Sequence, residues 1–237
     1  IMTEKIQNLM AENVREQKQK RKSELQALQA QINPHFLYNT LDSIIWMAEG
    51  GDTKNVVLMT SALARLLRKS ISNRHELVTL GEEMDYAKSY LTIQKMRYKD
   101  KLEYSVETSP YIREVKVIKL IVQPLVENAI YHGIKTRECG GTVRVEAAFE
   151  NDEIVIRITD DGAGMSPEQL AHIFDERKVD TAHHGVGVLN VQQRIRLYYG
   201  ADYGLSFTST EGVGTTATIR IPALAPSDYP PQKIADT

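Results

Sequence analysis

Three polar side chains interrupt an apolar stretch between residues 117 and 134. Glu127, Asn128 and His132 place a carboxylate, an amide and an imidazole on adjoining turns of the helix that this stretch predicts. Burying polar groups costs free energy unless they find partners, so three of them on one apolar helix indicate a functional role. Hard oxygen ligands suit Mg²⁺, which usually keeps waters and takes its remaining ligands from phosphates. The stretch could therefore hold a phosphate together with its magnesium ion.

Glycine-rich stretches follow at three places further along the chain. A strand expected over 154–159 ends in residues 160–164, which read Asp-Asp-Gly-Ala-Gly. A carboxylate there can accept a hydrogen bond from an amino group such as adenine N6, and glycines let the backbone approach a flat ring. Gly185 and Gly187 precede a predicted helix, whose free N–H groups and dipole favour phosphate, and residues 212–215 precede the last strand.

Each of these stretches alone also fits an ordinary turn, and only their order along the chain is specific. The sequence lacks both a G-x-G-x-x-G pattern after a first strand and a G-K-[ST] pattern. Dinucleotide-binding and P-loop sites are therefore excluded as explanations of the glycines.

His35, which directly follows Pro34, is the other residue whose side chain could take part in a reaction. Pro34 interrupts a helical pattern, so the chain kinks there or Asn33 caps a new helix whose first residue is Pro34. His35 then lies among apolar neighbours, on a helix with no other histidine. A lone histidine is more often packed or simply exposed than reactive, and only the downstream motifs change that expectation.

Two amphipathic helices are expected to carry His35. Residues 1–48 lack glycine and show a thin apolar stripe, and a turn at 50–52 leads to a second helix with Leu63 and Leu66 on its apolar side. So narrow a stripe cannot be buried against a globular core, whereas two helical hairpins can bury their stripes in a four-helix bundle. We therefore expect a homodimer.

Helical and strand patterns alternate after residue 80. We expect helices over 80–97, 117–134, 166–174 and 188–199, and strands over 101–107, 142–149, 153–159, 205–209 and 216–221. This arrangement predicts an α+β fold in which an α/β sandwich, with helices on one face of a single sheet, follows the helical hairpin. The proline-containing tail after residue 222 is expected to be disordered.

Composition excludes several classes of protein. The 237 residues are 42% hydrophobic and 25% charged, as in ordinary globular proteins. The formal net charge of −2 gives no reason to expect nucleic-acid binding, and the single cysteine, Cys139, excludes an internal disulfide. No run of about 18 apolar residues predicts a membrane-spanning helix. The abrupt helical start at Ile1 leads us to expect a piece of a longer chain.

In this order the motifs resemble the Bergerat-type ATP-binding fold shared by histidine kinases, DNA gyrase, the heat-shock chaperone ATPases and the mismatch-repair ATPases. Residues 118–135 resemble its N box, 160–164 its G1 box, 185–187 its G2 box and 212–215 its G3 box. The resemblance implies ATP and Mg²⁺ as cofactors.

Two further stretches narrow the resemblance. Residues 31–41, which read QINPHFLYNTL, and residues 123–130, which read QPLVENAI, are similar to sensor histidine kinases of the LytS/YesM type. The resemblance covers about residues 23–222 and implies a protein histidine kinase that phosphorylates itself at His35. It further implies a homodimer, a response regulator whose receiver-domain aspartate takes the phosphoryl group, and a cytoplasmic location below an upstream membrane sensor segment.

The resemblance also implies a role for each motif residue. Asn128 would ligate Mg²⁺, and Asp160 would select adenine. Glu127 becomes the candidate second metal ligand or catalytic base, and His132 a phosphate or ribose contact. The nucleotide pocket would be shaped by Gly162, Gly164, Gly185, Gly187 and Thr215.

The same resemblance suggests four segments. Residues 1–22 would form a signalling linker helix, 23–97 the dimerisation and phosphotransfer helices, 98–222 the catalytic ATP-binding domain, and 223–237 a disordered tail.

Two positions depart from common family patterns, and a third fits them. Phe36 follows the acceptor where the commonest histidine kinases carry an acidic residue, and Tyr131 stands where relatives carry lysine. Asn39 lies one turn beyond His35, at the place of a phosphatase-supporting Thr or Asn in the commoner families, and is equally well explained as a helix-surface residue.

Two other readings keep the ATP site without phosphotransfer: an ATP-driven clamp, and a dimeric scaffold in which ATP is structural. The pairing of Pro34 and His35 with a complete set of boxes favours the kinase.

Overall fold

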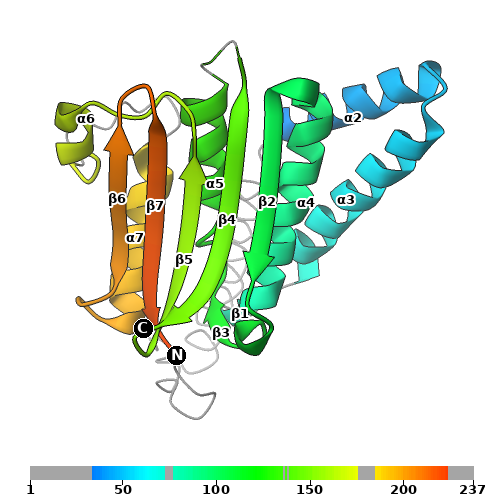
Figure 1. Cartoon of the computed structure of the whole chain (residues 1–237). Coiled ribbons are helices and arrows are strands. Elements are labelled where there is room, and N and C mark those ends of the chain that lie inside the picture. Colours follow the sequence, from blue (N-terminus) through cyan, green and yellow to red (C-terminus); the bar gives the residue numbers. More distant parts are fainter. Residues whose placement is uncertain (1–33, 73–76, 136, 138, 176–184, 224–237) are drawn as a thin grey trace, which may run out of the picture. The chain divides into compact units, whose positions relative to one another are not determined.

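The computed structural model describes residues 34–72, 77–135, 137, 139–175 and 185–223. These residues fall into two compact units, Ile1–Asn73 and Arg74–Thr237 (Figure 1). The helix expected before Pro34, the cap at Asn33 and the tail after residue 223 lie outside the described residues.

The first unit contains a helical hairpin. Helices α2 (Pro34–Glu49) and α3 (Thr53–Ser72) are joined by a tight turn in which Gly51 has a φ of 75°, a conformation that favours glycine. The Asp52 carboxylate accepts hydrogen bonds from the backbone N–H of Asn55 at 3.3 Å and from its side-chain amide at 2.7 Å. The predicted turn and the cap at Asp52 are therefore confirmed.

The apolar side of α3 is already buried in the single chain. The exposed fractions of Met59, Leu63 and Leu66 are 0%, 6% and 4%. These three side chains are therefore buried within one copy of the chain, whereas the sequence led us to expect a second copy to cover them. Among the described side chains of this unit, the large apolar ones that are exposed lie on α2 and the first half of α3: Tyr38, Leu41, Ile45, Trp46, Val57 and Leu58.

The second unit is built on a five-stranded sheet. Its strands, in spatial order, are β2 (Leu102–Thr108), β4 (Gly141–Glu150), β5 (Glu153–Asp160), β7 (Gly214–Pro222) and β6 (Gly204–Thr210). The pair β2–β4 is parallel and the other pairs are antiparallel. The short strands β1 (Leu77–Thr79) and β3 (Lys116–Ile118) pair separately.

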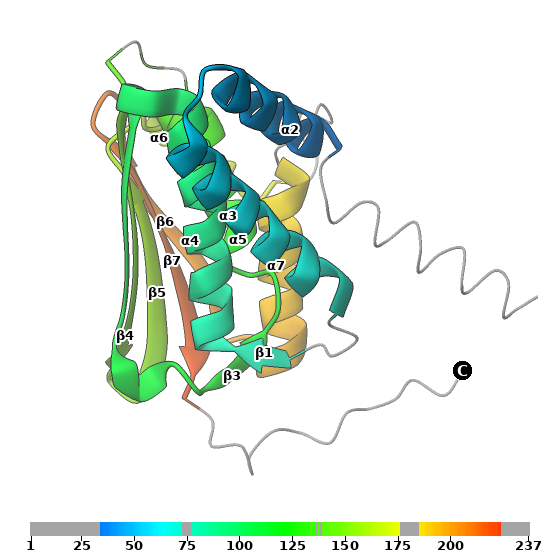
Figure 2. The same ribbon diagram turned by 90° about the vertical axis from the view of Figure 1, so that its right-hand side faces the viewer.

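Helices lie on one side of this sheet, as Figures 1 and 2 show. They are α4 (Leu80–Tyr98), α5 (Gln123–Asn128), the π-helical segment η3 (Ala129–Ile134) and α7 (Gly185–Tyr199). The short helix α6 (Pro167–Ala171) and the 3₁₀ turns η1 (Lys99–Lys101) and η2 (Pro110–Ile112) complete the described elements. The predicted α+β sandwich is confirmed.

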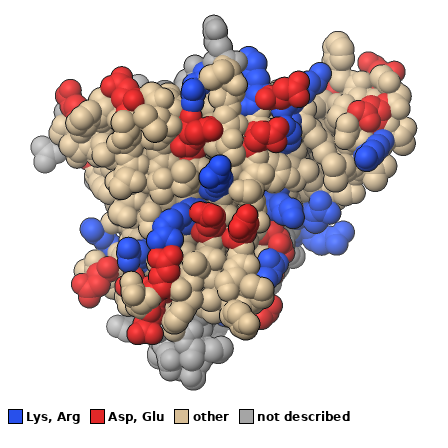
Figure 3. Space-filling view, in the orientation of Figure 1, with Lys and Arg blue, Asp and Glu red and all other residues tan. Residues whose placement is uncertain are grey.

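Alternation along the strands explains why the helices cover only one face. On the central strands Val145, Ile158 and Ala217 are register partners, and all three are buried. The opposite face carries charged side chains, which gather over the sheet in Figure 3. On that face the Arg157 guanidinium group and the Glu150 carboxylate form an ion pair at 2.6 Å, so these two charged side chains are paired at the protein surface.

The single helix predicted over 117–134 is wrong in its first part. Val117 and Ile118 belong to strand β3, and the helix starts only at Gln123. Between them Leu120 has a φ of 59°, which ends any helical path. The apolar run hid this break because a short buried strand and a buried helix have the same apolar pattern.

A buried carboxylate on α4 holds the turn that the pattern missed. Glu83 is 6% exposed and accepts the backbone N–H groups of Leu120 at 2.8 Å, Ile121 at 3.1 Å and Val122 at 3.3 Å. Burial raises the pKa of Glu83, whereas these N–H groups and the charge of Arg194 act in the opposite direction. Glu83 thereby fixes the point at which α5 begins.

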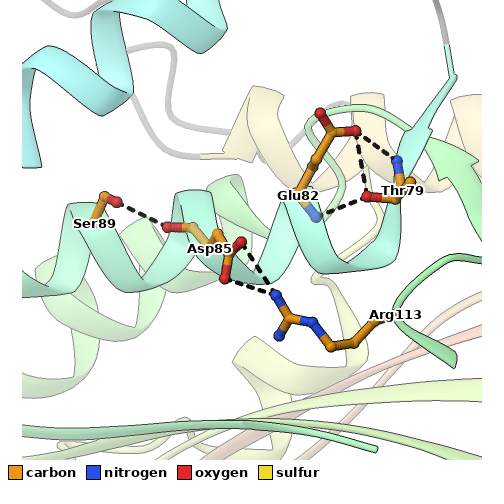
Figure 4. A network of polar contacts seen from close by, with 5 residues as sticks. All are labelled: Thr79, Glu82, Asp85, Ser89 and Arg113. Atoms are coloured by element: carbon orange, nitrogen blue, oxygen red, sulfur yellow. Dashed lines mark hydrogen bonds and ion pairs between the residues drawn. The ribbon is translucent and has the colours of Figure 1, made fainter. Parts of the chain in front are cut away.

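The N-terminal end of α4 is tied down by a second polar network (Figure 4). The Thr79 hydroxyl accepts the N–H of Glu82 at 3.1 Å, and the Glu82 carboxylate accepts the N–H of Thr79 at 2.8 Å, which is a capping box. One turn later Arg113 donates to Asp85 at 3.1 and 3.2 Å. Helix α4 is therefore held by contacts within the second unit, whereas the sequence grouped residues 80–97 with the helical hairpin.

Replacing Glu83 by glutamine tests the first of these networks. Glu83→Gln places an amide N–H₂ against backbone N–H donors, so buried donors lose their acceptor. We expect the free energy of unfolding to fall by about 1–3 kcal/mol, measured by urea denaturation. The exposed Glu107→Gln is the matched control, and equal unfolding midpoints for the two variants would contradict the assigned role.

Candidate functional site

Asp160 is the most unusual ionisable group at the end of the sheet. It ends strand β5 and is only 5% exposed. Its Oδ1 accepts the N–H of Gly162 at 2.9 Å, and the N–H of Thr215 also donates to the carboxylate. Burial raises the pKa of Asp160 to about 6, while the two N–H groups oppose this shift and Asp161 adds to it.

The Asp160 carboxyl group packs against the π-helical segment η3. A Cβ atom at Gly133 would lie 2.5 Å from Asp160 Oδ1, so only glycine fits at this position. The loop N–H of Ala163 donates to the carbonyl of Gly133 at 3.1 Å, which fastens the loop to the same turn. The end of β5 and the end of η3 therefore form one packed unit.

The loop glycines are needed for packing between backbones. A Cβ at Gly162 would lie 2.3 Å from the backbone of Gly133, and one at Gly164 would lie 2.0 Å from the carbonyl oxygen of Thr210. Gly164 also has a φ of +66°. The sequence analysis attributed these glycines to the approach of a flat ring, and the structure gives a further cause that lies within the chain itself.

Thr215 reaches the same place from the first residues of β7. It is the register partner of Asp160, and its hydroxyl lies 2.9 Å from the Ser209 hydroxyl. The N–H of Met165 donates to Ser209 at 2.8 Å, so the loop after Asp160 is tied to both β6 and β7. Asp160, Gly162, Gly164 and Thr215, predicted from separate motifs, are thus brought together.

The polar residues of the predicted magnesium site lie on α5 and η3. Glu127 is largely buried, and its Oε1 accepts a hydrogen bond from Gln123 Nε2 at 2.8 Å. Burial raises the pKa of Glu127, and the Gln123 contact acts in the opposite direction. Asn128 is half-buried at the last position of α5, and His132 is exposed on η3. The π-helical turn, closed by the N–H of Lys135 on Ile130 at 2.8 Å, is a local distortion often found at functional sites.

These residues fit a magnesium ion held by few protein atoms. Within the described ranges, no group of three or more His, Cys, Asp and Glu side chains could hold a metal ion. A carboxylate or an amide oxygen suits Mg²⁺, which takes one or two protein ligands and fills its remaining positions with water and phosphate.

The start of α7 meets the start of α5. Helix α7 begins at Gly185, and a Cβ at Gly187 would lie 3.6 Å from the Pro124 side chain, which is ordinary contact. The helix N-terminus predicted to hold phosphate therefore lies beside the helix that carries Glu127 and Asn128.

His35 lies in the other unit, exposed on the first turn of α2. The side-chain nitrogen of Asn39 lies 3.2 Å from His35 Nδ1 and 3.1 Å from Nε2, at the edge of the ring between the two nitrogens. The Asn39 side chain, one turn beyond His35, therefore lies against the imidazole ring.

Sequence reasoning missed two residues that shape the site. Gly133 was a signal that could have been read, because a glycine inside a helical pattern often marks close approach of another backbone. Glu83 gave a weaker signal. It is an acidic residue at a buried position of a helix, and this is recognised only when the burial of α4 is known.

Comparison with known sequences agrees with this geometry. The family described as "Histidine kinase" matches residues 23–102, and the family described as "Histidine kinase-, DNA gyrase B-, and HSP90-like ATPase" matches residues 114–225. Sensor histidine kinase YesM of Bacillus subtilis is 38% identical over 94% of this chain and 37% of its own length. The chain belongs to the histidine kinase family.

The chain covers only part of the length of the histidine kinases that it matches. Sensor protein LytS of Staphylococcus haemolyticus is 30% identical over 85% of this chain and 34% of its own length. The chain thus spans little more than a third of the length of these curated relatives. None of the helices in the described part of the chain has the length and apolar character needed to cross a bilayer.

Two solved histidine kinases match this chain at low sequence identity. The catalytic domain of ThkA is 16% identical, with a TM-score of 0.49 over 63% of this chain and 99% of that chain. The histidine kinase domain of Erythrobacter litoralis EL346 is 17% identical, with a TM-score of 0.48 over 84% of this chain and 93% of that chain. Assignment to the family rests on the sequence matches.

Proposed function

We propose that this chain is the kinase portion of a sensor histidine kinase that phosphorylates itself at His35 from Mg·ATP. One observation carries the proposal: a single chain combines an exposed histidine with a candidate nucleotide site. The histidine lies on a helical hairpin. In the second unit, the buried carboxylate of Asp160 lies beside the helical segment that carries Glu127 and Asn128. Family membership supports the same conclusion.

The residues around Asp160 would bind the base of the nucleotide. An ionised carboxylate only accepts hydrogen bonds, and the adenine amino group only donates, so the two are complementary. The N–H groups of Gly162 and Thr215 hold this carboxylate in place, and Gly164 lets the following loop pack against Thr210. The first backbone N–H groups of α7, which lack partners within the helix, would receive phosphate oxygens.

Asn128 and Glu127 would hold Mg²⁺ next to these phosphates. The ion would supply positive charge that neutralises phosphate oxygens during transfer. A cation beside Glu127 favours its charged form and so offsets the desolvation that raises its pKa. His132, exposed one turn beyond Asn128, would contact a phosphate or the ribose.

His35 would act as the nucleophile. A ring nitrogen forms a bond to the γ-phosphorus, the bond between that phosphorus and the bridging oxygen breaks, and ADP leaves with the electron pair. The proton of the ring would pass to solvent or to Glu127, the candidate base. Because imidazole needs little activation, positioning and charge neutralisation supply most of the rate acceleration.

The partners follow from the same proposal. The phosphoryl group would pass from His35 to an aspartate of a response-regulator receiver domain. Two copies of the chain would pair through their helical hairpins, on the cytoplasmic side of a membrane whose sensor segment precedes this part of the protein. The exposed apolar side chains of α2, including Ile45 and Trp46, would provide the surface for that pairing.

Loss of the acceptor histidine tests the proposed reaction. With γ-labelled ATP and Mg²⁺, we expect the wild type to acquire label that acid removes and alkali does not, as for a phosphorus–nitrogen bond. His35→Gln should abolish this label and leave ATP affinity unchanged, because His35 lies outside the nucleotide-binding unit.

The control is His172→Gln, which alters another partly exposed histidine and should keep the label. Label of wild-type amount on the His35→Gln protein would show that a different residue is the acceptor. ATP hydrolysis without any labelled protein would instead favour an ATP-driven clamp.

Charge on the exposed apolar surface tests the pairing of two chains. We expect Ile45→Glu combined with Trp46→Glu to convert a dimer into a monomer that still binds ATP, measured by light scattering. Burying a large apolar side chain contributes roughly 1.5–3 kcal/mol, so placing two charges there on each copy removes this stabilisation and adds the cost of burying charge.

Tyr111→Glu is the matched control, since Tyr111 is 94% exposed in the second unit and should leave the dimer intact. A wild type that is monomeric at micromolar concentration, or a double variant that remains dimeric, would rule out this surface.

A further inference from the structure

A hydrogen bond within α5 holds the Glu127 carboxylate by one of its two oxygens. Gln123 Nε2 donates to Glu127 Oε1 at 2.8 Å, across one turn of the helix. Among the described residues, no second hydrogen-bond donor contacts this largely buried carboxylate. The orientation of the carboxylate therefore depends on a single neighbouring side chain.

The other oxygen of Glu127, Oε2, is accessible to water. In the described part of the chain, no fully buried side-chain oxygen lacks a hydrogen-bond partner, and Oε2 has no partner there. A carboxylate oxygen only accepts hydrogen bonds or binds cations. With Oε1 tied to Gln123, the lone pairs of Oε2 are presented in one direction.

Glu127 lies on the side of α5 that meets the start of α7. A Cβ atom at Gly187 would lie 3.6 Å from the Pro124 side chain. Glu127 follows Pro124 by three residues, so both side chains lie on the same side of adjoining turns. The carboxylate therefore belongs to the side of α5 that faces the N–H groups proposed to receive phosphate.

Residues other than Gln123 hold the start of α5 in place. The Glu83 carboxylate accepts the backbone N–H groups of residues 120–122, and no described side chain caps the helix at Val122. The amide of Gln123 is directed along the helix to Glu127 instead. The carboxylate that it contacts therefore explains why a glutamine stands at this position.

We propose that Gln123 is a positioning residue for autophosphorylation: its hydrogen bond to Oε1 fixes the Glu127 carboxylate so that Oε2 faces the reacting groups. Gln123 itself touches neither the nucleotide nor the acceptor histidine. Fixed orientation matters because a displacement of about 1 Å from the productive geometry can lower a rate about a hundredfold. This role rests on the proposed function, in which Glu127 is a ligand of Mg²⁺ or the base.

Replacing Gln123 by methionine removes the donor and keeps an unbranched side chain that favours helix. We expect Gln123→Met to lower the rate of His35 labelling at saturating Mg·ATP about tenfold, because Glu127 loses only the group that orients it. Adenosine affinity, measured by calorimetry, should be unchanged, since the base contacts Asp160. Urea denaturation verifies folding, and Gln193→Met, at an exposed position of α7, is the matched control that should label at the wild-type rate.

A double variant separates positioning from a structural role. Glu127→Gln should lower the labelling rate about a hundredfold. Adding Gln123→Met to it should lower the rate less than about twofold further, because no carboxylate is left to position. The gain in ATP affinity on addition of Mg²⁺, measured by calorimetry, should change in Gln123→Met only if it changes in Glu127→Gln.

Losses that multiply in the double variant, or a wild-type labelling rate in Gln123→Met, would overturn the role of Gln123 alone. A wild-type labelling rate in Glu127→Gln would overturn the role of Glu127 and that of Gln123 with it. A wild-type protein that acquires no label would instead overturn the proposed function.

Discussion

The site depends on a carboxylate that the fold removes from water. Asp160 lies at the end of β5 with its oxygens against Gly133, and only two backbone N–H groups oppose the desolvation that raises its pKa. A buried carboxylate without enough hydrogen-bond donors costs free energy. The close packing of the surrounding backbone leaves the Asp160 carboxylate no room to turn toward water. Glycine at 133 and at 162 is the condition for that arrangement.

A second buried carboxylate acts at the other end of the same segment. Glu83 holds the three N–H groups that precede α5, and Asp160 meets Gly133 near the end of η3. The segment from Gln123 to Ile134, which carries Glu127 and Asn128, is therefore fixed at both ends by acidic side chains from outside it. Such fixation keeps ligand groups at constant distance from the nucleotide, which is what catalysis by positioning requires.

Much of this organisation could be predicted from the sequence. The hairpin turn at 50–52, the strand pair β4–β5 and the cap of α6 at Ser166 follow from local turn and capping chemistry, which is read from neighbouring residues. The motif residues around Asp160 were found because glycine and aspartate cluster at the ends of strands. Their specific roles stay predictions.

The parts that could not be predicted depend on contacts between distant residues. The break at Leu120 requires Glu83, 37 residues away, a contact that no local pattern encodes. For the same reason the sequence could not show what covers Leu63 and Leu66. An apolar stripe indicates that a helix face will be covered but does not identify the element that covers it.

The affinity of ATP for the wild type and for Asp160→Asn, measured by calorimetry as a function of pH, tests the central claim most directly. The titration of ATP itself is common to both proteins, so the ratio of affinities reports Asp160 alone. At neutral pH, above the pKa of about 6, Asp160 accepts from the adenine amino group, and the variant should bind at least about tenfold more weakly. Well below that pKa the carboxyl group is protonated, and the ratio should approach one. Equal affinities at neutral pH would contradict the account.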